Sequence, residues 1–439
     1  MHKFGTDGIR SKAENFTPDF LARIVRGLVD YAGDNIKIFL AGDTRESTEW
    51  IIEDLAKACE TFGLEYATAG ILPTPGINYC FYEMGFDFAI DVTASHNPYT
   101  DNGIKVFERG TDQGTKLCEK GRTAIESVLA DSNFSYDPVS VTDRADLHTE
   151  ALELYREHLL NYVGSADFSG LHIGMDCANG ATSVINQTIF EQLGATVELI
   201  NCQPNYNTKI NQDCGSTHLD QLRDLVTSKN LDFGVAFDGD GDRCLAIDSK
   251  GNEVDGDQML AFLSQFLGLD AIVTTVMANQ GLLNWAKDAN IHAEITAVGD
   301  PNVVSAMIEQ DIQIGSEQNG HVILPGLTSG DGMLTALMIT KAVSDSGKSL
   351  ANLASIITKF PQVILNMEAT PEQKQALKEK ATSKQLLLEY DEKLKSVDGR
   401  LLIRPSGTEN LIRITMWGND AKAIDKLAHE LKTKLGETL

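Results

Sequence analysis

The chain has 439 residues, of which 42% are hydrophobic and 23% are charged, so it can form several folded domains and is not of the disordered class. Asp and Glu outnumber Lys and Arg by 63 to 37, which gives a formal net charge of -26. This balance argues against nucleic acid or an anionic membrane as a partner, because both need a basic face, but it permits a small anionic substrate held by a few local arginines.

The amino terminus and the cysteines predict a cytoplasmic protein. The opening sequence MHKFGTDGIRS lacks the apolar core of a secretion signal, and no segment approaches the ~20 apolar residues of a membrane span. The seven cysteines are scattered without a CxxC pair. That pattern is typical of reduced thiols and not of a disulfide framework or a zinc site.

Apolar runs that end in polar, glycine-rich turns recur along the chain and are expected to be strands. They lie at 36–45, 88–98, 171–180, 233–243 and 312–321. Helices are expected at 47–63 and 182–194. Strands that alternate with helices predict α/β units, and ligands collect at the carboxyl ends of strands in such sheets, where each of the polar turns falls.

The length of the chain corresponds to about three or four domains. Candidate boundaries are the polar stretch 131–150, the turn 249–258, and the change after Leu365 to a Lys/Glu-rich helical segment that starts at Pro371. The last part differs from the rest, because residues 399–418 are typical of two strands around a tight polar loop. A helix follows whose apolar face is predicted to contain Ile424, Leu427, Ala428, Leu431 and Leu435.

Two motifs in the first part of the chain carry candidate chemistry. Arg10 follows the glycine-rich turn FGTDGIR, and Ser95 stands beside His96 in TASHNP. A serine next to a histidine suggests a hydrolase, but the GxSxG elbow is absent and no triad is evident. Read alone, TASHNP is equally compatible with a capped turn.

The strongest local motif is FDGDGDRC, in which Asp238, Asp240 and Asp242 can offer three carboxylates to one ion. Hard oxygen ligands without His or Cys indicate Mg²⁺, with Mn²⁺ or Ca²⁺ as weaker candidates. A calcium EF-hand is excluded, because its sixth and twelfth positions would be Arg243 and Ser249. The alternative is an acidic surface turn.

Two later motifs offer groups for a sugar and a phosphate. In GSEQNGH, three alternating polar side chains could hydrogen-bond vicinal hydroxyls: Glu317, Asn319 and His321. RPSGTENLIR combines guanidinium groups, hydroxyls and a glycine turn suited to a phosphate dianion, through Arg404, Ser406, Gly407, Thr408 and Arg413. An ordinary polar loop and an unliganded hairpin are the respective alternatives. A P-loop is not supported, because its first glycine is replaced by Ala342.

Taken in order, FGTDGIR, TASHNPYTDNGIKVF, FDGDGDR, SEQNGH and RPSGTEN resemble the signature loops of the α-D-phosphohexomutase family. The resemblance implies four domains around a central cleft, three of them similar α/β domains with mixed sheets and the fourth a smaller α+β domain. On this basis the domains are expected at 1–150, 151–253, 254–366 and 367–439. The motifs GTDGIR, EQxGH and RPSGTE resemble the branch of the family that acts on glucosamine phosphates more than the phosphoglucomutase/phosphomannomutase branch.

The resemblance also implies a role for each candidate residue. Ser95 would be the phosphoserine, and one Mg²⁺ would be held by Ser95, Asp238, Asp240 and Asp242. The transferring phosphoryl group would be surrounded by Arg10, His96, Lys105 and Arg243, with Lys105 exchanging the proton of the substrate hydroxyl. The sugar would contact Glu317, Asn319 and His321. The distal phosphate would be clamped by Arg404, Ser406, Gly407, Thr408 and Arg413. A hexosamine 1,6-bisphosphate would be the intermediate and activator.

Some positions depart from the family pattern, and rival functions remain open. Asn319 replaces the usual serine, Asn410 replaces a proline, and Ser11 replaces a glycine. The sequence GDPN at 299–302 lacks the arginine of the GDR pattern. The changes near the sugar leave phosphoglucomutase/phosphomannomutase activity as an alternative. Others are a phosphatase with Asp238 as nucleophile and a non-catalytic phosphosugar-binding protein. The expected partner is a small phosphosugar, and the chain is expected to be a monomer or a homodimer.

Overall fold

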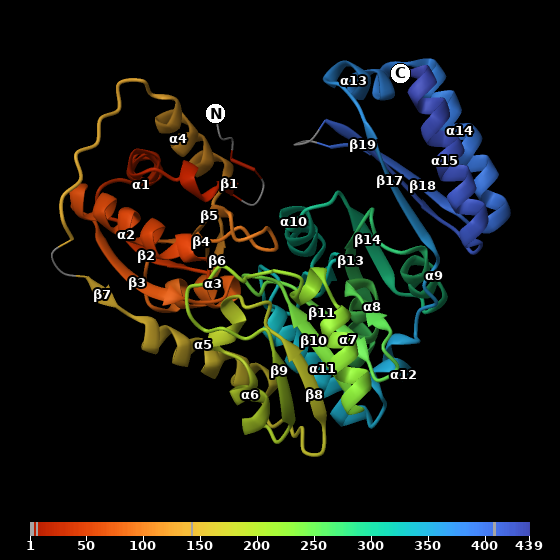
Figure 1. Cartoon of the computed structure of the whole chain (residues 1–439), viewed down its shortest axis with the longest axis horizontal. Helices are drawn as coiled ribbons and strands as arrows, with labels where there is room; N and C mark the ends of the chain where they lie inside the picture. Colours follow the sequence, from red (N-terminus) through yellow and green to blue (C-terminus); the bar gives the residue numbers. More distant parts are fainter. Residues whose placement is uncertain (1–3, 6–7, 142–143, 407–409) are drawn as a thin grey trace.

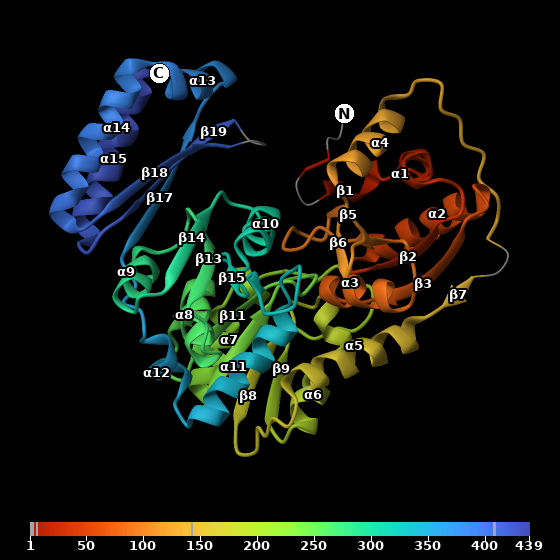
Figure 2. The same cartoon turned by 180° about the vertical axis from the view of Figure 1, so that it is seen from behind.

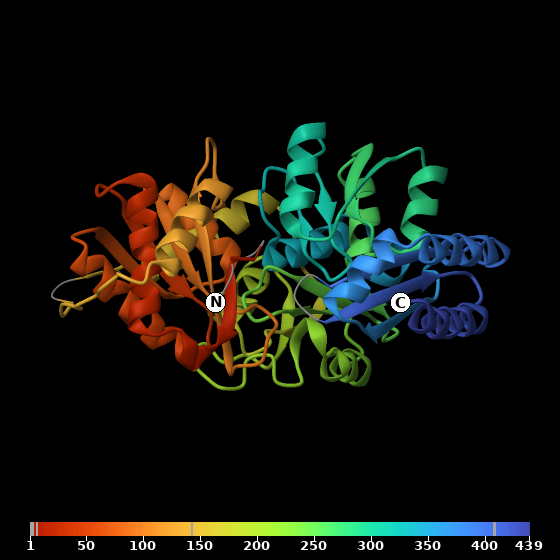
Figure 3. The ribbon, with the colours of Figure 1, turned by 90° about the horizontal axis from the view of Figure 1, so that it is seen from above.

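The computed structural model describes residues 4–5, 8–141, 144–406 and 410–439, which form four units, each built on one β-sheet. Figures 1 and 2 show the units in an arc, with the first (red to yellow) and the fourth (blue) at its two ends. Seen from above in Figure 3, the second (yellow-green) and third (teal) units lie on opposite sides between them. Within the described residues, no helix is both long and apolar enough to cross a bilayer.

The first unit has a mixed sheet in the order β1-β5-β4-β2-β3-β7, with β6 paired to β5. Strands β2, β3, β4 and β7 are parallel, whereas β5 runs antiparallel to β1, β4 and β6. Because β4 turns directly back into β5, the loop that carries Ser95 lies at the carboxyl end of β4. The strands are β1 (Ile9–Lys12), β2 (Lys37–Gly42), β3 (Glu65–Ile71), β4 (Phe88–Val92), β5 (Asp101–Arg109), β6 (Gly114–Lys116) and β7 (Ala145–Asp146).

Helices α1 (Pro18–Ala32), α2 (Glu46–Thr61), α3 (Thr74–Glu83) and α4 (Glu119–Ala130) complete the first unit. Helix α1 begins at a proline in its first turn, and Thr17 caps it by accepting the backbone N–H of Phe20. The expected helix 47–63 is confirmed as α2. The expected strands 36–45 and 88–98 are confirmed as β2 and β4, which end where their polar turns start.

The second unit has the order β12-β11-β10-β8-β9, in which β8, β9 and β10 are parallel and β11 runs antiparallel to both β10 and β12. Its elements are β8 (His172–Asp176), β9 (Thr196–Ile200), β10 (Phe233–Phe237), β11 (Cys244–Asp248), β12 (Glu253–Val254), α5 (His148–Val163), α6 (Gln187–Gln192) and α7 (Asp220–Lys229). The single helix expected at 182–194 is wrong. Ile185 and Asn186 have non-helical backbone angles and separate a short 3₁₀ turn from α6.

The third unit has the order β14-β13-β15-β16. Its elements are β13 (Ala271–Thr275), β14 (His292–Thr296), β15 (Gly315–Ser316), β16 (Val322–Ile323), α8 (Gly256–Phe266), α9 (Gln280–Asp288), α10 (Asp300–Gln310), α11 (Gly332–Ser346) and α12 (Leu350–Ala354). The strand expected at 312–321 is only the two-residue β15, because the chain turns at once into an antiparallel pairing with β16. This tight hairpin carries the sugar-loop motif.

The fourth unit is a three-stranded antiparallel sheet in the order β17-β19-β18, packed against two long helices. Its elements are β17 (Gln362–Glu368), β18 (Arg400–Pro405), β19 (Leu411–Trp417), α13 (Pro371–Glu379), α14 (Ala381–Leu394) and α15 (Ala421–Thr438). Four of the five residues predicted for the apolar face of α15 are fully buried. This unit has a core of its own, whereas one continuous core joins the other three.

A buried hydrogen bond ties the second unit to the third. The hydroxyl of Tyr155, on α5, donates to the carboxylate of Asp331 at 3.0 Å from both oxygens, and Asp331 caps α11 by accepting the N–H of Leu334. Both side chains are buried, and burial raises the pKa of Asp331 to about 6.

Changing Tyr155→Phe is expected to lower the free energy of unfolding by about 1–3 kcal/mol, because the buried carboxylate loses its only side-chain donor among the described contacts. Urea unfolding followed by circular dichroism measures the change. The same substitution at the exposed Tyr99 is the control and should be near neutral. Equal midpoints and slopes for Tyr155→Phe and the wild type would contradict the expectation.

Candidate active site

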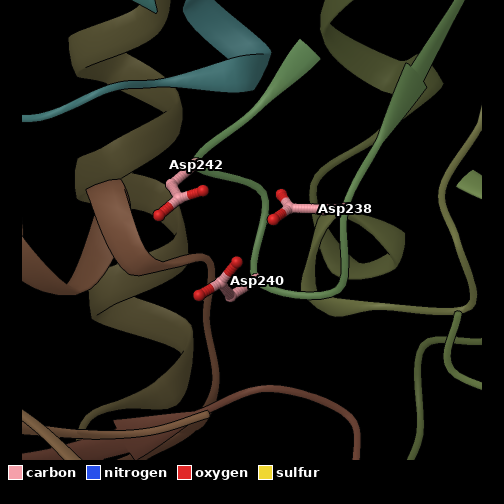
Figure 4. Close-up of side chains that lie close together, drawn as sticks. All are labelled: Asp238, Asp240 and Asp242. Atoms are coloured by element: carbon pink, nitrogen blue, oxygen red, sulfur yellow. The ribbon is translucent and has the colours of Figure 1, made fainter. Parts of the chain in front are cut away.

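The loop between β10 and β11 brings three carboxylates together. Oxygen atoms of Asp238, Asp240 and Asp242 all lie within 4.8 Å of one another, and the three residues are only 1%, 1% and 5% exposed. Figure 4 shows the side chains converging from one turn of the loop. Gly239 is needed here, because a Cβ at this position would lie 2.6 Å from the backbone oxygen of Ser95.

The three carboxylates repel one another and keep unused acceptor positions. Burial and the charges of Asp240 and Asp242 raise the pKa of Asp238 well above its usual range. The Oδ1 atoms of Asp240 and Asp242 are buried without a hydrogen-bond partner. Clustered carboxylate oxygens with unused acceptor positions fit a hard divalent cation such as Mg²⁺, so residues 238–243, here named the metal loop, could hold the predicted metal.

Ser95 lies directly against this loop, although it belongs to the first unit. Its Oγ donates to Asp238 Oδ2 at 2.8 Å and is 3.2 Å from His96 Nδ1. Its backbone has φ +51°, a left-handed conformation that is strained for a residue with a side chain. The N–H of Ser95 donates to Thr93 Oγ1, and its carbonyl accepts from Arg45 and Asn211 at 2.7 and 2.8 Å. These contacts hold the hydroxyl in one place.

His96 lies beside the serine hydroxyl, within electrostatic reach of two arginines. Arg243 Nη1 donates to His96 Nδ1 at 3.0 Å. Burial, together with the charges of Arg243 and Arg10, lowers the pKa of His96 to about 4. His96 is therefore neutral near pH 7. Arg10 lies on β1, where it is the register partner of Gly103 on β5.

Lys105 joins the first unit to the metal loop. It lies on β5, is 3% exposed, and its ammonium donates to Asp240 Oδ2 at 2.8 Å and to Asp242 Oδ2 at 3.2 Å. Lys105, His321 and Arg243 outweigh the effect of burial and hold the pKa of Asp242 well below its usual range. The cluster thus contains its own cations next to the carboxylates.

The hairpin between β15 and β16 carries the predicted sugar-binding residues. Glu317 accepts the N–H of Gly299 at 2.9 Å and the Asn319 amide at 3.3 Å. Asn319 in turn accepts the N–H of His321 at 3.1 Å. The amide that replaces the expected serine therefore braces its own loop.

His321 connects this hairpin to the metal loop. Its ring lies 3.7 Å from Asp242 and 3.6 Å from Asp300. Burial lowers the pKa of His321, but these carboxylates outweigh it and the pKa is above the usual value. Lys116 of the first unit pairs with Asp300 at 2.5 Å. Lys116 therefore supplies a positive charge next to Asp300, although the arginine of the GDR pattern is missing.

The fourth unit contributes a pair of arginines. Arg404 and Arg413 are register partners on β18 and β19. Burial and the charge of Arg413 lower the pKa of Arg404, while Glu317 acts in the opposite direction, so Arg404 is within electrostatic reach of the hairpin between β15 and β16. Lys374 donates to the carbonyl of Ser406 at 3.0 Å. The predicted residues Gly407 and Thr408 lie outside the described residues.

The sequence did not predict the side chains that hold the Ser95 carbonyl. Arg45 is fully buried, pairs with Asp43 at 3.1 Å and holds the Ser95 carbonyl, and Asn211 holds the same carbonyl from the second unit. Arg45 follows the apolar run of β2 in the same way that Ser95 follows β4. Because ligands gather at the carboxyl ends of strands, Arg45 was identifiable as a candidate site residue on the same grounds as Ser95.

Models of one protein family match consecutive parts of the chain. They are described as Phosphoglucomutase/phosphomannomutase, alpha/beta/alpha domain I for residues 1–135, domain II for 153–251 and domain III for 255–360, and as the C-terminal domain for 367–434. Full-length curated relatives agree. Phosphoglucosamine mutase of Caldicellulosiruptor bescii is 38% identical, with 99% of each chain covered. Phosphoglucosamine mutase of Clostridium tetani is 38% identical, covering 98% of this chain and 97% of its own.

Solved structures have the same fold. A phosphoglucomutase/phosphomannomutase family protein of Burkholderia thailandensis superposes with a TM-score of 0.77 at 18% identity, covering 99% of this chain and 97% of its own. The N-acetylphosphoglucosamine mutase of Aspergillus fumigatus, solved with GlcNAc-6P and magnesium, gives a TM-score of 0.65 at 16% identity, covering 100% and 96%. At these identities the likeness shows the fold.

Proposed function

The chain belongs to the phosphoglucomutase/phosphomannomutase family, and from this premise we propose that it interconverts glucosamine 6-phosphate and glucosamine 1-phosphate through a phosphorylated Ser95. It is an isomerase that transfers a phosphoryl group within a phosphosugar. The observation that carries the proposal is the 2.8 Å contact between Ser95 Oγ and Asp238, which joins the serine of one unit to the carboxylate cluster of the next. Glucosamine is chosen because full-length relatives at 36–38% identity bear the name phosphoglucosamine mutase.

In the proposed reaction, the phosphoryl group of Ser95 passes to the free hydroxyl of the bound hexosamine monophosphate. The P–O bond to Ser95 breaks as the bond to the sugar forms, which gives a 1,6-bisphosphate. The bisphosphate turns end for end, and its other phosphoryl group returns to Ser95. One Mg²⁺ held by Asp238, Asp240, Asp242 and Ser95 would supply charge stabilisation at the transferring group.

The residues around Ser95 have distinct tasks in this scheme. Arg243 and Arg10 are the cations near His96 and would neutralise oxygens of the phosphoryl group. Neutral His96 accepts a hydrogen bond from Arg243 and so keeps its guanidinium at Ser95. Lys105 is our candidate for exchanging the proton with the substrate hydroxyl.

The opposite side of the site would hold the sugar and the phosphate that is not reacting. Glu317 and His321 lie on the hairpin next to the metal loop and would bind sugar hydroxyls, with Asn319 bracing the hairpin. Arg404 and Arg413 of the fourth unit would clamp the distal phosphate, together with Ser406 and the neighbouring Gly407 and Thr408. Since the fourth unit has its own core, it can close over the substrate as a body.

We also propose that the enzyme works in the cytoplasm on this small-molecule substrate. All seven cysteines lie among the described residues, and none forms a disulfide, which fits a reducing compartment.

A parallel assay of three sugar phosphates tests the choice of substrate. Purified protein with Mg²⁺ and a trace of hexose 1,6-bisphosphate should isomerise glucosamine phosphate at least about tenfold faster, by kcat/KM, than glucose or mannose phosphate. A faster rate with glucose or mannose phosphate would reject the glucosamine assignment and leave the phosphoryl transfer in place. No isomerisation of any of the three, although Ser95 becomes phosphorylated, would favour a non-catalytic phosphosugar-binding protein.

A further inference from the structure

Two cysteines outside the site lie at the ends of neighbouring parallel strands. Cys177 directly follows β8, and Cys202 comes two residues after β9. Asp176 and Ile200 are register partners, and the N–H of Cys177 donates to the Ile200 carbonyl at 3.3 Å. Continuing this register places Cys177 opposite Asn201, the residue before Cys202, and the left-handed backbone of Asn201 (φ +47°) turns the chain at this point. Adjacent strands are about 4.8 Å apart, which is within the Cα separation of about 4.4–6.8 Å that a disulfide spans.

The two thiols are in contact but differ in environment. Their side-chain hydrogen bond is the largest influence on the pKa of each. Cys177 is fully buried, whereas Cys202 is only partly buried. Cys202 Sγ also accepts from Asn186 Nδ2 at 3.1 Å and lies 3.8 Å from the Ser183 carbonyl. Cys202 is therefore the more exposed residue of the pair.

The same contacts make Cys202 the reactive partner. Hydrogen bonding from Cys177 and Asn186 outweighs burial and lowers the pKa of Cys202 to about 7, while the pKa of Cys177 is raised well above its usual value. A thiolate is the form of cysteine that reacts with peroxides. The buried cysteines at 59, 80, 214 and 244 all have raised pKa values and lack this property.

We propose that Cys177 and Cys202 form a reversible disulfide and that this redox modification slows the enzyme. The statement about rate rests on the proposed function, whereas the disulfide itself does not. The oxidant is a hydroperoxide. The Cys202 thiolate attacks its terminal oxygen, so that an S–O bond forms, the O–O bond breaks and the alcohol or water leaves with a proton.

The resulting sulfenic acid on Cys202 is then resolved by Cys177. The Cys177 sulfur attacks the oxidised sulfur, the S–S bond forms, the S–O bond breaks, and water leaves with the thiol proton. The two sulfurs lose two electrons in total, and these reduce the peroxide bond. A dithiol reductant reverses the reaction by exchange.

The turn after Cys177 couples this pair to the active site. The carbonyl of Cys177 accepts the N–H of Gly180 at 2.7 Å, and the N–H of Ala181 donates to the carbonyl of Gly239 in the metal loop at 2.8 Å. On the other side, Thr44, the neighbour of Arg45, donates to the Asn179 carbonyl at 2.6 Å. Closing the non-bonded contact of the two sulfurs to an S–S bond of about 2.05 Å would move the turn that contacts both the metal loop and the support of Ser95.

Mapping of disulfides after oxidation tests the proposal. Protein reduced with dithiothreitol and freed of reductant is treated with hydrogen peroxide, alkylated and digested without reduction. Mass spectrometry should find the peptides containing Cys177 and Cys202 linked. Isomerase activity should fall about tenfold or more, because small displacements of catalytic groups have large effects on rate, and dithiothreitol should restore it.

Two variants complete the test. Cys202→Ser should form no link and lose no activity on oxidation, whereas Cys214→Ser should behave like the wild type. Cys214 is the matched control, because it lies in the same unit and Asn179 contacts its sulfur at 3.8 Å. Free thiols at both positions after peroxide, a sulfinic acid on Cys202 without a link, or a different pairing would overturn the disulfide. A complete link with unchanged turnover would overturn the effect on rate. If untreated protein has no isomerase activity, the proposed function fails while the mass map still decides the disulfide.

Discussion

Replacing Ser95 with alanine is expected to abolish isomerisation, lowering kcat by at least about 10⁴-fold, because the phosphoryl group loses the oxygen that carries it between turnovers. The substitution should be structurally mild. Ser95 Oγ contacts Asp238 and His96, whereas the backbone of the residue is held by Thr93, Arg45 and Asn211, whose contacts remain. A coupled assay for glucosamine 1-phosphate measures the rate, and intact mass reports whether the chain still accepts a phosphoryl group from hexose 1,6-bisphosphate.

Ser127→Ala is the matched control for this variant. Ser127 is exposed on α4 of the same unit, and its substitution should leave both the rate and the phosphorylation unchanged. An alanine variant at Ser95 that keeps the full rate would remove the phosphoserine mechanism. A covalent phosphate found on Asp238 would instead support the phosphatase-type nucleophile.

The candidate residues that the structure brings together could be predicted from the sequence, because each occupies a short motif whose spacing determines its local geometry. Asp238, Asp240 and Asp242 alternate with glycines, so one turn suffices to gather their oxygens. The motif that contains Ser95 follows an apolar strand, which places it at the carboxyl end of that strand. The family resemblance then supplied the order of these loops, which no single motif provides.

Contacts that depend on the pairing of distant segments were not accessible. Lys105 meets Asp240 only because β5 lies beside β4 and the second unit packs against the first. Arg45 and Asn211 converge on one carbonyl from different units for the same reason. The helix expected at 182–194 failed because its apolar spacing is compatible with a helix, whereas the break at Ile185 and Asn186 is set by their backbone angles.

Changing Asp238→Asn is expected to remove metal dependence and activity together. The variant keeps an oxygen for the Ser95 hydroxyl but loses one of three carboxylate ligands, so Mg²⁺ affinity should fall about 100-fold or more and kcat at least about 10³-fold. Isothermal titration with Mg²⁺, or with Mn²⁺ as a probe, measures binding directly. In the wild type, a chelator should abolish turnover and added Mg²⁺ should restore it. Asp224→Asn, at an exposed position on α7, is the control and should bind metal normally.

The stability of the same variant distinguishes a metal site from a structural acidic cluster. Burial and the charges of Asp240 and Asp242 raise the pKa of Asp238, so at neutral pH this carboxyl destabilises the metal-free fold, a cost that diminishes as pH falls toward its unfolded pKa. Asp238→Asn removes that cost, and the metal-free variant should unfold at a Tm no lower than that of the metal-free wild type. Added Mg²⁺ should raise the Tm of the wild type and not that of the variant, since only a bound ligand stabilises the folded state. The opposite result is a metal-free variant with a lower Tm than the metal-free wild type, together with a wild-type Tm that does not change when Mg²⁺ is added. It would mean that the carboxylates hold the loop together and bind no cation.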